Sequence, residues 1–302
     1  MIIVRLAGGM GNQLFQYAFG RALAHRHNVP LKLDLHVLEG RSYDQTMTAR
    51  NYALDVFKLP VQLATPDDVS QYVPFVATQS NSQLTQYAQR FIRKASRTLN
   101  PRYIAEKDAS RFDANVLLTA PSHCYVAGYW QSERYFLQIQ DELRSELRIA
   151  IPLTGQAAVL ASFIKTVASV CVHVRRTDFL TDAHQTSITP DQIRQGVSEL
   201  IRRGIEPVLF VFSDDMDWCR QQVRESNAPI HYVSDDEVGH DVGVHFQLMM
   251  YCCHFISSVS TFSWWAAWLS NHPSQLVFHP PHRRSSDWPA QNWITLPELP
   301  IN

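Results

Sequence analysis

The chain has 302 residues, of which 45% are hydrophobic and 18% are charged, an ordinary globular composition with room for two domains. Its 27 basic and 28 acidic side chains give a formal net charge of −1, which argues against a nucleic-acid-binding protein, because such proteins usually carry a clear basic excess. Any anion must therefore be bound locally, by a few placed cations.

The cysteines and the apolar segments indicate the compartment. The five cysteines include no C-x-x-C pair and are odd in number, which favours a reducing compartment without disulfides. The apolar stretch at 1–9 is too short for a signal peptide, and serines and a threonine interrupt the most apolar later segment, 255–269. We therefore expect a soluble, cytoplasmic protein.

The first half opens with a β-α-β pattern. It predicts a strand at 1–6, a tight turn, a helix over 13–27 and a second strand at 31–36, and this order favours a parallel sheet. Residues 41–120 are polar and less regular, and we expect helices and long loops there. A further strand is predicted at 123–130, followed by one amphipathic helix over 132–149 with Phe136, Ile139, Leu143 and Leu147 in register.

The second half follows a break rich in Pro and Gly at 151–155, which we take as the domain boundary. Strands and helices alternate beyond it: strands at 169–174, 207–215, 230–233, 254–258 and 275–280, and helices at about 190–203, 216–225, 241–253 and 262–270. The pattern predicts an α/β protein of two Rossmann-like domains, 1–150 and 151–302, facing across a cleft.

Polar clusters follow three of these strands: Arg175 and Arg176, residues 213–215, and residues 258–263. Parallel sheets bind ligands beyond the carboxyl ends of their strands, so three clusters at one edge indicate a ligand site.

The cluster HVRRTD at 173–178 has the chemistry of a phosphate site. Two guanidinium groups can neutralise a pyrophosphate without a metal, and His173 points to the same side of its strand as Arg175. Asp178 could orient an arginine or take a proton. The alternative is a surface ion-pair network in which Asp178 bridges the arginines.

The segment 257–269 runs from a strand through Ser and Thr residues into an apolar helix, whose first turn forms a second potential anion site. The alternative is a simple cap on a core helix, and we expect Trp264, Trp265 and Trp268 to serve packing. Asp215 and Asp217 form a D-x-D triplet that could hold a divalent cation, although Asp217 equally suits the first turn of a helix.

Two segments of the first half also carry polar groups. GGMGNQ at 8–13 lacks the third glycine of a dinucleotide fingerprint, but its glycines allow a close backbone approach to a ligand. Alternatively it is a turn without a ligand, capped by Asn12 and Gln13. GYWQSERYF at 128–136 mixes aromatics with polar groups, as a sugar-binding wall does, or it is a helix capped by Ser132 with core aromatics.

Together, five segments resemble the bacterial α-1,2-fucosyltransferases of glycosyltransferase family 11: RLAGGMGNQLFQYAFGRALA, GYWQSERYF, HVRRTD, FSDDMDWC and LMMYCCHFISSVSTFSWWAAWL. HVRRTD is also similar to the H-x-R-R-x-D element of α-1,6- and protein O-fucosyltransferases. The resemblance implies a GT-B fold that holds GDP-fucose mainly in its second domain. It further implies that L-fucose is transferred to the 2-hydroxyl of a galactose with inversion and without a metal or other cofactor.

The resemblance also implies roles for individual residues. Arg175 contacts the β-phosphate, with Arg176 bracing the motif and His173 near the guanosine. Arg175, Asp178 and Asn12 are the expected catalytic residues. The other expected donor-binding residues are Gly11, Asn12, Asp214, Asp241 (with His245 as its rival for the guanine), Ser260, Thr261, Phe262 and Ser263. The expected acceptor-binding residues are Asp34, His36, Trp130, Gln131 and Glu133. The base candidates are Asp178, Asp34, His36 and Glu133.

Two other functions stay open: a metal-dependent glycosyltransferase that uses another nucleotide sugar, and a non-catalytic GDP-sugar-binding protein. For the fucosyltransferase, we expect a galactose-terminated, lipid-linked O-antigen or capsule repeat unit as the acceptor, at the inner membrane face. This implies at most peripheral membrane contact.

Overall fold

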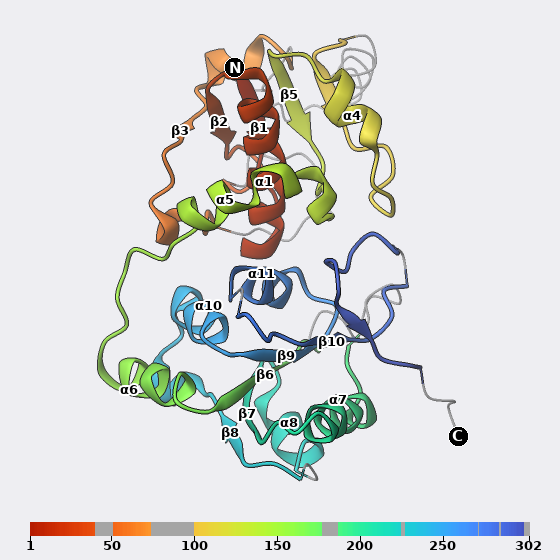
Figure 1. The fold of residues 1–302 in the computed structure, drawn as a ribbon. Coiled ribbons are helices and arrows are strands. Elements are labelled where there is room, and N and C mark those ends of the chain that lie inside the picture. Colours follow the sequence, from red (N-terminus) through yellow and green to blue (C-terminus); the bar gives the residue numbers. More distant parts are fainter. Residues whose placement is uncertain are drawn as a thin grey trace, which may run out of the picture. The chain divides into compact units, whose positions relative to one another are not determined.

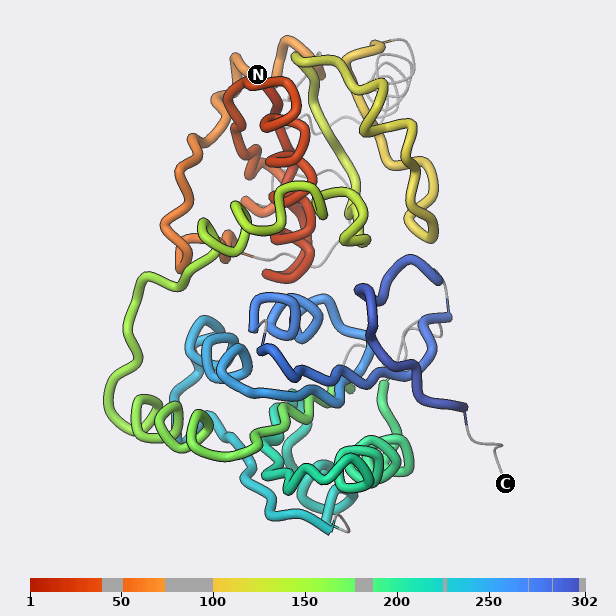
Figure 2. The backbone as a smooth tube through the Cα atoms, in the orientation of Figure 1, coloured from red at the N-terminus to blue at the C-terminus, as the bar shows by residue number. Residues whose placement is uncertain are grey.

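The structure is a computed structural model that describes residues 1–39, 51–73, 100–176, 187–224, 227–270, 272–283 and 285–298. The chain divides into two compact units, unit 1 from Met1 to Arg148 and unit 2 from Ile149 to Asn302. It crosses from one to the other once, between helices α5 and α6 (Figure 2).

The sheet of unit 1 is parallel throughout, in the order β3-β2-β1-β5-β4. The predicted strands are present as β1 (Ile2–Arg5), β2 (Leu31–Asp34) and β5 (Cys124–Ala127), and all three are largely buried. The sequence did not indicate β3 (Gln62–Leu63) and β4 (Tyr103–Ala105), which lie at the two edges. Edge strands of two or three residues are too short to show a periodic pattern.

Helix α1 (Met10–His27) packs so closely on β1 that a glycine is needed at the contact. A Cβ at Gly20 would lie 2.2 Å from Val4 Cγ2. The predicted apolar face is buried at Phe15, Ala18 and Phe19. The N-terminus of α1 follows β1 directly and is thereby fixed at the carboxyl edge of the sheet.

The single helix predicted over 132–149 is wrong. The segment forms two 3-10 turns, η2 (Glu133–Tyr135) and η3 (Leu137–Ile139), and then α5 (Gln140–Glu146). Phe136 interrupts the helix with φ −136, and its ring is buried 6.1 Å from that of Phe15. The predicted apolar residues are all buried. The burial pattern was therefore predicted correctly, although the backbone does not form the continuous helix that was expected.

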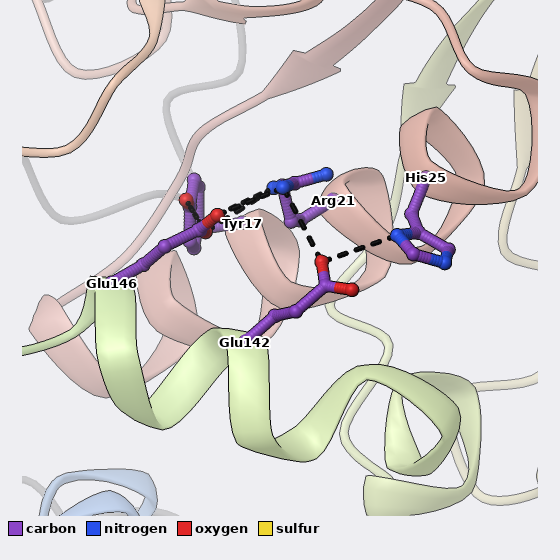
Figure 3. Close-up of polar contacts among 5 residues, drawn as sticks. All are labelled: Tyr17, Arg21, His25, Glu142 and Glu146. Atoms are coloured by element: carbon purple, nitrogen blue, oxygen red, sulfur yellow. Dashed lines mark hydrogen bonds and ion pairs between the residues drawn. The ribbon is translucent and has the colours of Figure 1, made fainter.

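A half-buried polar cluster joins α5 to α1 (Figure 3). Tyr17 donates its hydroxyl to Glu146 Oε2 at 2.6 Å, and Arg21 donates to Glu146 Oε1 through Nε at 3.0 Å and Nη2 at 2.8 Å. His25 Nδ1 lies 3.1 Å from Glu142 Oε2. Burial and the bonded Glu146 carboxylate raise the pKa of Tyr17, so its hydroxyl stays a donor.

The sheet of unit 2 is also parallel, in the order β11-β10-β9-β6-β7-β8. The five predicted strands are present: β6 (Ala168–Val174), β7 (Pro207–Ser213), β8 (Ile230–Tyr232), β9 (His254–Ser257) and β10 (Val277–His279). The sixth, β11 (Ile294–Thr295), has only two residues and was not predicted.

Helices cover both faces of this sheet. Helices α7 (Pro190–Arg202) and α8 (Met216–Gln222) lie on one face, and α10 (Val242–Met250) and α11 (Thr261–Ser270) on the other (Figure 1). These four helices were predicted. Trp264 and Trp265 of α11 are fully buried and Trp268 nearly so, as expected for packing residues. The other short helices of the described residues are η1 (Asp55–Phe57), α2 (Pro66–Ser70), α4 (Ala114–Thr119), α6 (Gly155–Ile164) and α9 (Asp235–Val238). The first three lie in the segment 41–120, where helices were expected, whereas α6 and α9 were not predicted.

Two parallel α/β sheets confirm the predicted fold class. In unit 1 β1 and β5 are neighbours, and in unit 2 the strand order reverses at one point, between β6 and β9. Parallel sheets of this kind bind ligands in the crevice at that reversal. No helix in the described ranges combines the length and apolarity needed to cross a bilayer.

Candidate active site

Arg175 and Arg176 leave the end of β6, beside the strand-order reversal of unit 2. Their partners are the two aspartates that follow β7. Arg175 Nε lies 3.2 Å from Asp214 Oδ2, and Arg176 donates its backbone N–H to Asp214 Oδ1 at 2.9 Å and its Nε to Asp215 Oδ2 at 3.0 Å. Asp214, which we predicted to bind the sugar donor, therefore orients both arginines.

The ion-pair network that the sequence suggested is thus present with different acids. Asp178 lies outside the described residues, and the neighbouring strand β7 supplies the carboxylates. Only the pairing of β6 with β7 brings them together, because Asp214 and Asp215 are nearly forty positions from the arginines along the chain.

The D-x-D triplet is engaged in local structure. Asp215 caps α8 by accepting from the Trp218 N–H at 3.1 Å, and the Arg176 guanidinium lies 4.1 Å from the centre of the Trp218 ring. Asp217 occupies the first turn of α8, as the alternative predicted, and lies 3.4 Å from Arg220. The described residues contain no group of three or more His, Cys, Asp or Glu side chains placed to hold a metal ion.

The turn from β9 into α11 packs against the arginine loop. Ser258 Oγ accepts the backbone N–H of Arg175 at 3.1 Å and that of Ile188 at 3.1 Å, so one hydroxyl joins three segments. We had grouped Ser258 with the polar cluster but had not named it as a site residue. The helical bonding of α11 begins where Trp264 donates to Ser260 at 2.9 Å, so the preceding N–H groups of Thr261, Phe262 and Ser263 form its first turn.

His173 is buried beneath this loop. Only 6% of the residue is exposed, and its Nδ1 has no hydrogen-bond partner within the described part of the chain. Burial and the charge of Arg175 lower its pKa to about 4, so the ring is neutral at pH 7. Its ring centre lies 6.1 Å from that of Phe262, which in turn contacts Phe246 of α10.

Both candidates for reading the guanine have local partners. Asp241 caps α10 by accepting the Gly243 N–H at 2.7 Å. His245 Nε2 lies 2.9 Å from the Gly239 carbonyl oxygen and 3.0 Å from Asp235 Oδ1. Their assignment stays a prediction.

In unit 1, the glycine turn lies at the end of β1. Gly8 has φ +78, Gly9 is the N-cap of α1, and no side chain caps this helix, so Asn12 and Gln13 do not cap it as the alternative interpretation required. Gln13 instead braces the turn by donating to the Gly8 carbonyl at 2.9 Å. Gln16, which we did not predict, joins the turn to the next strand end by accepting from Ala7 N at 2.9 Å and donating to Gly128 O at 3.1 Å.

The strand end after β5 meets this turn. Gln131 Nε2 donates to Asn12 Oδ1 at 2.9 Å, which joins the predicted donor-side and acceptor-side residues beyond the ends of the neighbouring strands β1 and β5. Gly11 lies beside them in the first turn of α1. The structure thus brings the two motifs together although they lie more than 110 positions apart in the chain.

The aromatic residues of this segment are core residues. Trp130 is 1% exposed, and its ring stacks on Phe19 with the centres 4.2 Å apart. Glu133 is 8% exposed. These values favour the core interpretation of Trp130 over the sugar-binding wall. The hydroxyl of Ser132 caps no helix, contrary to the alternative we had weighed.

A carboxylate that we did not predict holds the turn after β5. Glu106 accepts the backbone N–H groups of Tyr129 at 2.7 Å and Trp130 at 2.9 Å. Trp130 has φ +58, a left-handed conformation that is strained for a bulky side chain. Burial raises the pKa of Glu106, although the two N–H bonds oppose the shift.

Asp34 and His36 contact each other at the end of β2. His36 Nδ1 lies 2.5 Å from Asp34 Oδ2, and Tyr125 of β5 donates its hydroxyl to the same oxygen at 2.6 Å. Asp34 is 3% exposed, so its carboxylate is a buried, hydrogen-bonded group.

Comparison with known proteins agrees with this geometry. The family model described as Glycosyl transferase family 11 matches residues 1–293. An α-1,2-colitosyltransferase of Escherichia coli is 29% identical over 93% of this chain and 91% of its own length. The O-antigen biosynthesis glycosyltransferase WbnK of Escherichia coli is 24% identical over 96% of this chain and 99% of its own length.

Among solved structures, NodZ α-1,6-fucosyltransferase soaked with GDP-fucose is 15% identical over 89% of this chain and 91% of its own, with a TM-score of 0.44, too low to support any inference. The family match covers nearly the whole chain and includes both the arginine pair at the strand-order reversal of unit 2 and the glycine turn at the end of β1 in unit 1. The chain therefore belongs to glycosyl transferase family 11.

Proposed function

We propose that this glycosyltransferase moves L-fucose from GDP-fucose to the 2-hydroxyl of a galactose in an O-antigen or capsule repeat unit, inverting the anomeric centre. The observation that carries the proposal is the arginine pair at the strand-order reversal of unit 2, held in place by Asp214 and Asp215. Fixed guanidinium groups suit a diphosphate because they are permanently charged and form two-point contacts with its oxygens.

The arginine pair is proposed to act on the leaving group, GDP. As the bond from fucose to GDP breaks, negative charge gathers on the β-phosphate. Arg175 and the first-turn N–H groups of α11, at Thr261 to Ser263, stabilise this charge without reorganising. Arg176 braces the loop, since its side chain already pairs with Asp215 and lies on Trp218. No metal takes part in this proposal.

Unit 1 is proposed to bind the acceptor, through the polar groups at the carboxyl edge of its sheet. Asn12 and Gln131 present amide groups suited to sugar hydroxyls, and Asp34 and His36 lie at the same edge of the sheet. Because one relative is an O-antigen biosynthesis glycosyltransferase, a lipid-linked galactose-terminated repeat unit is the acceptor we favour.

A colitosyl donor is the second candidate, because the other relative is named an α-1,2-colitosyltransferase. Colitose is fucose without its 3-hydroxyl, so the same diphosphate site serves both.

The test is a donor and acceptor panel. Release of GDP or UDP is measured with GDP-fucose, GDP-colitose, GDP-mannose and UDP-galactose, each with Galβ1,3- and Galβ1,4-linked disaccharides, and NMR of the product identifies the linkage. We expect turnover with GDP-fucose and an α-1,2 linkage. Turnover with GDP-colitose alone would show that colitose, and not fucose, is the transferred sugar. Binding without turnover of any donor would refute the proposed enzymatic activity.

A further inference from the structure

The buried pair of Asp34 and His36 has the geometry of an oriented base. Asp34 closes β2, and its Oδ1 also accepts the backbone N–H of His36 at 3.1 Å, in addition to the 2.5 Å contact between Oδ2 and Nδ1. The Asp34 side chain is 4% exposed, whereas the imidazole is 22% exposed. The acid is therefore enclosed while the ring reaches the surface.

Tyr125 fixes the carboxylate from two strands away. In the sheet register Asp34 lies beside Arg5, and Tyr125 lies beside Ile3, two positions earlier on the same strand. Alternate residues of a strand share a face, so these side chains lie on one face of the sheet. The hydroxyl of Tyr125 donates to Asp34 Oδ2 at 2.6 Å, and the charge of Arg5 acts on Tyr125. Tyr103 of β4 stacks on Tyr125 with the ring centres 5.4 Å apart, and Lys32, two positions before Asp34 on β2, pairs with Asp68 at 2.7 Å.

The charge state of Asp34 determines the tautomer of His36. Burial alone would raise the pKa of Asp34, but the hydrogen bond and charge of His36 and the bond from Tyr125 outweigh it, and the pKa is lowered. An ionised carboxylate only accepts hydrogen bonds, so the hydrogen of the neutral ring resides on Nδ1. The lone pair of Nε2 is then available to accept a proton.

We propose that His36 is the general base that deprotonates the acceptor hydroxyl and that Asp34 is its positioning residue. The inference rests on the proposed transfer reaction. The acceptor O–H proton moves to His36 Nε2 while that oxygen forms its bond to fucose C1. The bond from C1 to the β-phosphate oxygen breaks, and its electron pair leaves with GDP. Asp34 stabilises the imidazolium that results.

The location of the pair agrees with this role. It lies at the carboxyl edge of the unit 1 sheet, where Leu6 N–H donates to the Asp34 carbonyl at 2.9 Å just before the glycine turn begins. The other described candidate, Glu133, is 8% exposed within a turn of aromatic core residues. His36 combines an exposed edge with a buried orienting acid.

The decisive experiment compares His36→Gln with the wild type in steady-state transfer. We expect kcat to fall by about a hundredfold or more, with little change in the acceptor KM, because a general base acts in the transition state. A purely structural role would instead raise the acceptor KM or lower the melting temperature of the variant, which thermal melting measures.

Two further variants control the result. His25→Gln alters another histidine of unit 1 that pairs with a carboxylate, at 3.1 Å from Glu142, and should keep wild-type activity. Asp34→Asn would place an amide N–H against Nδ1 and move the ring hydrogen to Nε2, so kcat should fall while thermal melting verifies the fold.

The outcomes separate the two proposals. A wild type that transfers no sugar overturns the proposed function and the base with it. An active wild type whose His36→Gln variant stays within about threefold of its kcat overturns the base alone, since base catalysis contributes about a hundredfold or more.

Discussion

Arg175 and Arg176 are adjacent in sequence, yet different carboxylates hold their side chains. Asp214 pairs with the Arg175 Nε, and Asp215 pairs with Arg176, which also lies on the Trp218 ring. The Arg176 side chain is thereby held by two contacts, at its edge by Asp215 and on its plane by Trp218. Arg175 is the residue we expect to contact the phosphate, with a side chain that is 29% exposed.

Replacement of Arg175 by alanine should therefore lower kcat by about a hundredfold, or roughly 3 kcal/mol of transition-state stabilisation. Arg175→Lys should recover only part of this, because an ammonium lacks the forked donors. Initial rates with GDP-fucose test both variants, with circular dichroism to verify folding. Arg220→Ala, at an exposed arginine paired with Asp217, is the control and should be fully active. Near-normal rates for Arg175→Ala would rule out its role.

Buried histidines make unit 2 sensitive to acid. Burial and neighbouring positive groups, Arg175 and His272 respectively, lower the pKa of His173 and His254 to about 4, and burial lowers that of His279. Between pH 6.5 and 4 the unfolded chain binds protons that these folded residues do not. The free energy of unfolding should then decrease by up to about 1.4 kcal/mol per histidine for each pH unit lost.

Urea unfolding at pH 7 and pH 5, followed by tryptophan fluorescence, measures this change. Most carboxyl groups titrate below that window, so histidines dominate the difference. His173→Asn should reduce the pH dependence of the free energy of unfolding by the contribution of that one histidine. An unfolding midpoint that is the same at both pH values would contradict the buried, neutral state of these rings.

At the scale of elements, each site is assembled by neighbouring strand ends. In unit 2 the ends of β6, β7 and β9 bring together the arginines, the aspartates and Ser258. In unit 1 the ends of β1 and β5 join Asn12 to Gln131. The edge strand β4 contributes Glu106, which holds the strained turn that carries Gln131.

Substitution of Glu106 by glutamine should destabilise the protein by about 1–3 kcal/mol, because the amide replaces one of two acceptors and leaves a buried N–H unpaired. Turnover should fall as well, since the turn positions Gln131 against Asn12. Thermal melting and transfer rates measure the two effects. Asp108→Asn, in the same loop but exposed, should behave like the wild type. An unchanged melting temperature for Glu106→Gln would contradict the stabilising role of these two hydrogen bonds.

The element boundaries that the sequence missed have physical causes. The two-residue strands β3 and β11 exist because they complete a sheet edge, and nothing in two residues distinguishes a strand. The helix predicted over 132–149 is interrupted at Phe136, which has φ −136 and packs its ring against Phe15 instead of continuing a regular helix. Propensity and periodicity are local, whereas these contacts are not.

At the scale of the whole molecule, each of the two α/β units carries polar groups at the carboxyl edge of its sheet. The acids near the arginine pair already serve other partners: Asp214 and Asp215 hold arginines, and Asp215 also caps α8. In the proposed function, the guanidinium groups take the place that a divalent ion occupies in metal-dependent enzymes that use nucleotide sugars.

Addition of excess EDTA should consequently leave the rate of transfer within about twofold of the untreated enzyme, because permanently charged guanidinium groups already supply the phosphate contacts. Initial rates before and after chelation, with and without added Mn²⁺, test this. Complete loss of activity in EDTA that Mn²⁺ restores would favour the D-x-D interpretation and a metal-dependent mechanism.

The sequence by itself determined the class of fold, most of the buried strands and helices, and the residue types at the diphosphate site. Local apolar patterns indicate buried strands and amphipathic helices. Two adjacent arginines after a strand are poor core residues and suit an anion. The five motifs that resemble family 11 are likewise contiguous in sequence, and the family match confirmed them.

Only the tertiary structure decided which side chains contact one another. Asp214 and Asp215 rather than a nearby acid pair with the arginines, Tyr125 reaches across β1 to Asp34, and Glu106 holds the turn at Trp130. These contacts join residues that are 23 to 91 positions apart. They follow from strand order and register, which depend on how the sheet assembles and not on any local pattern.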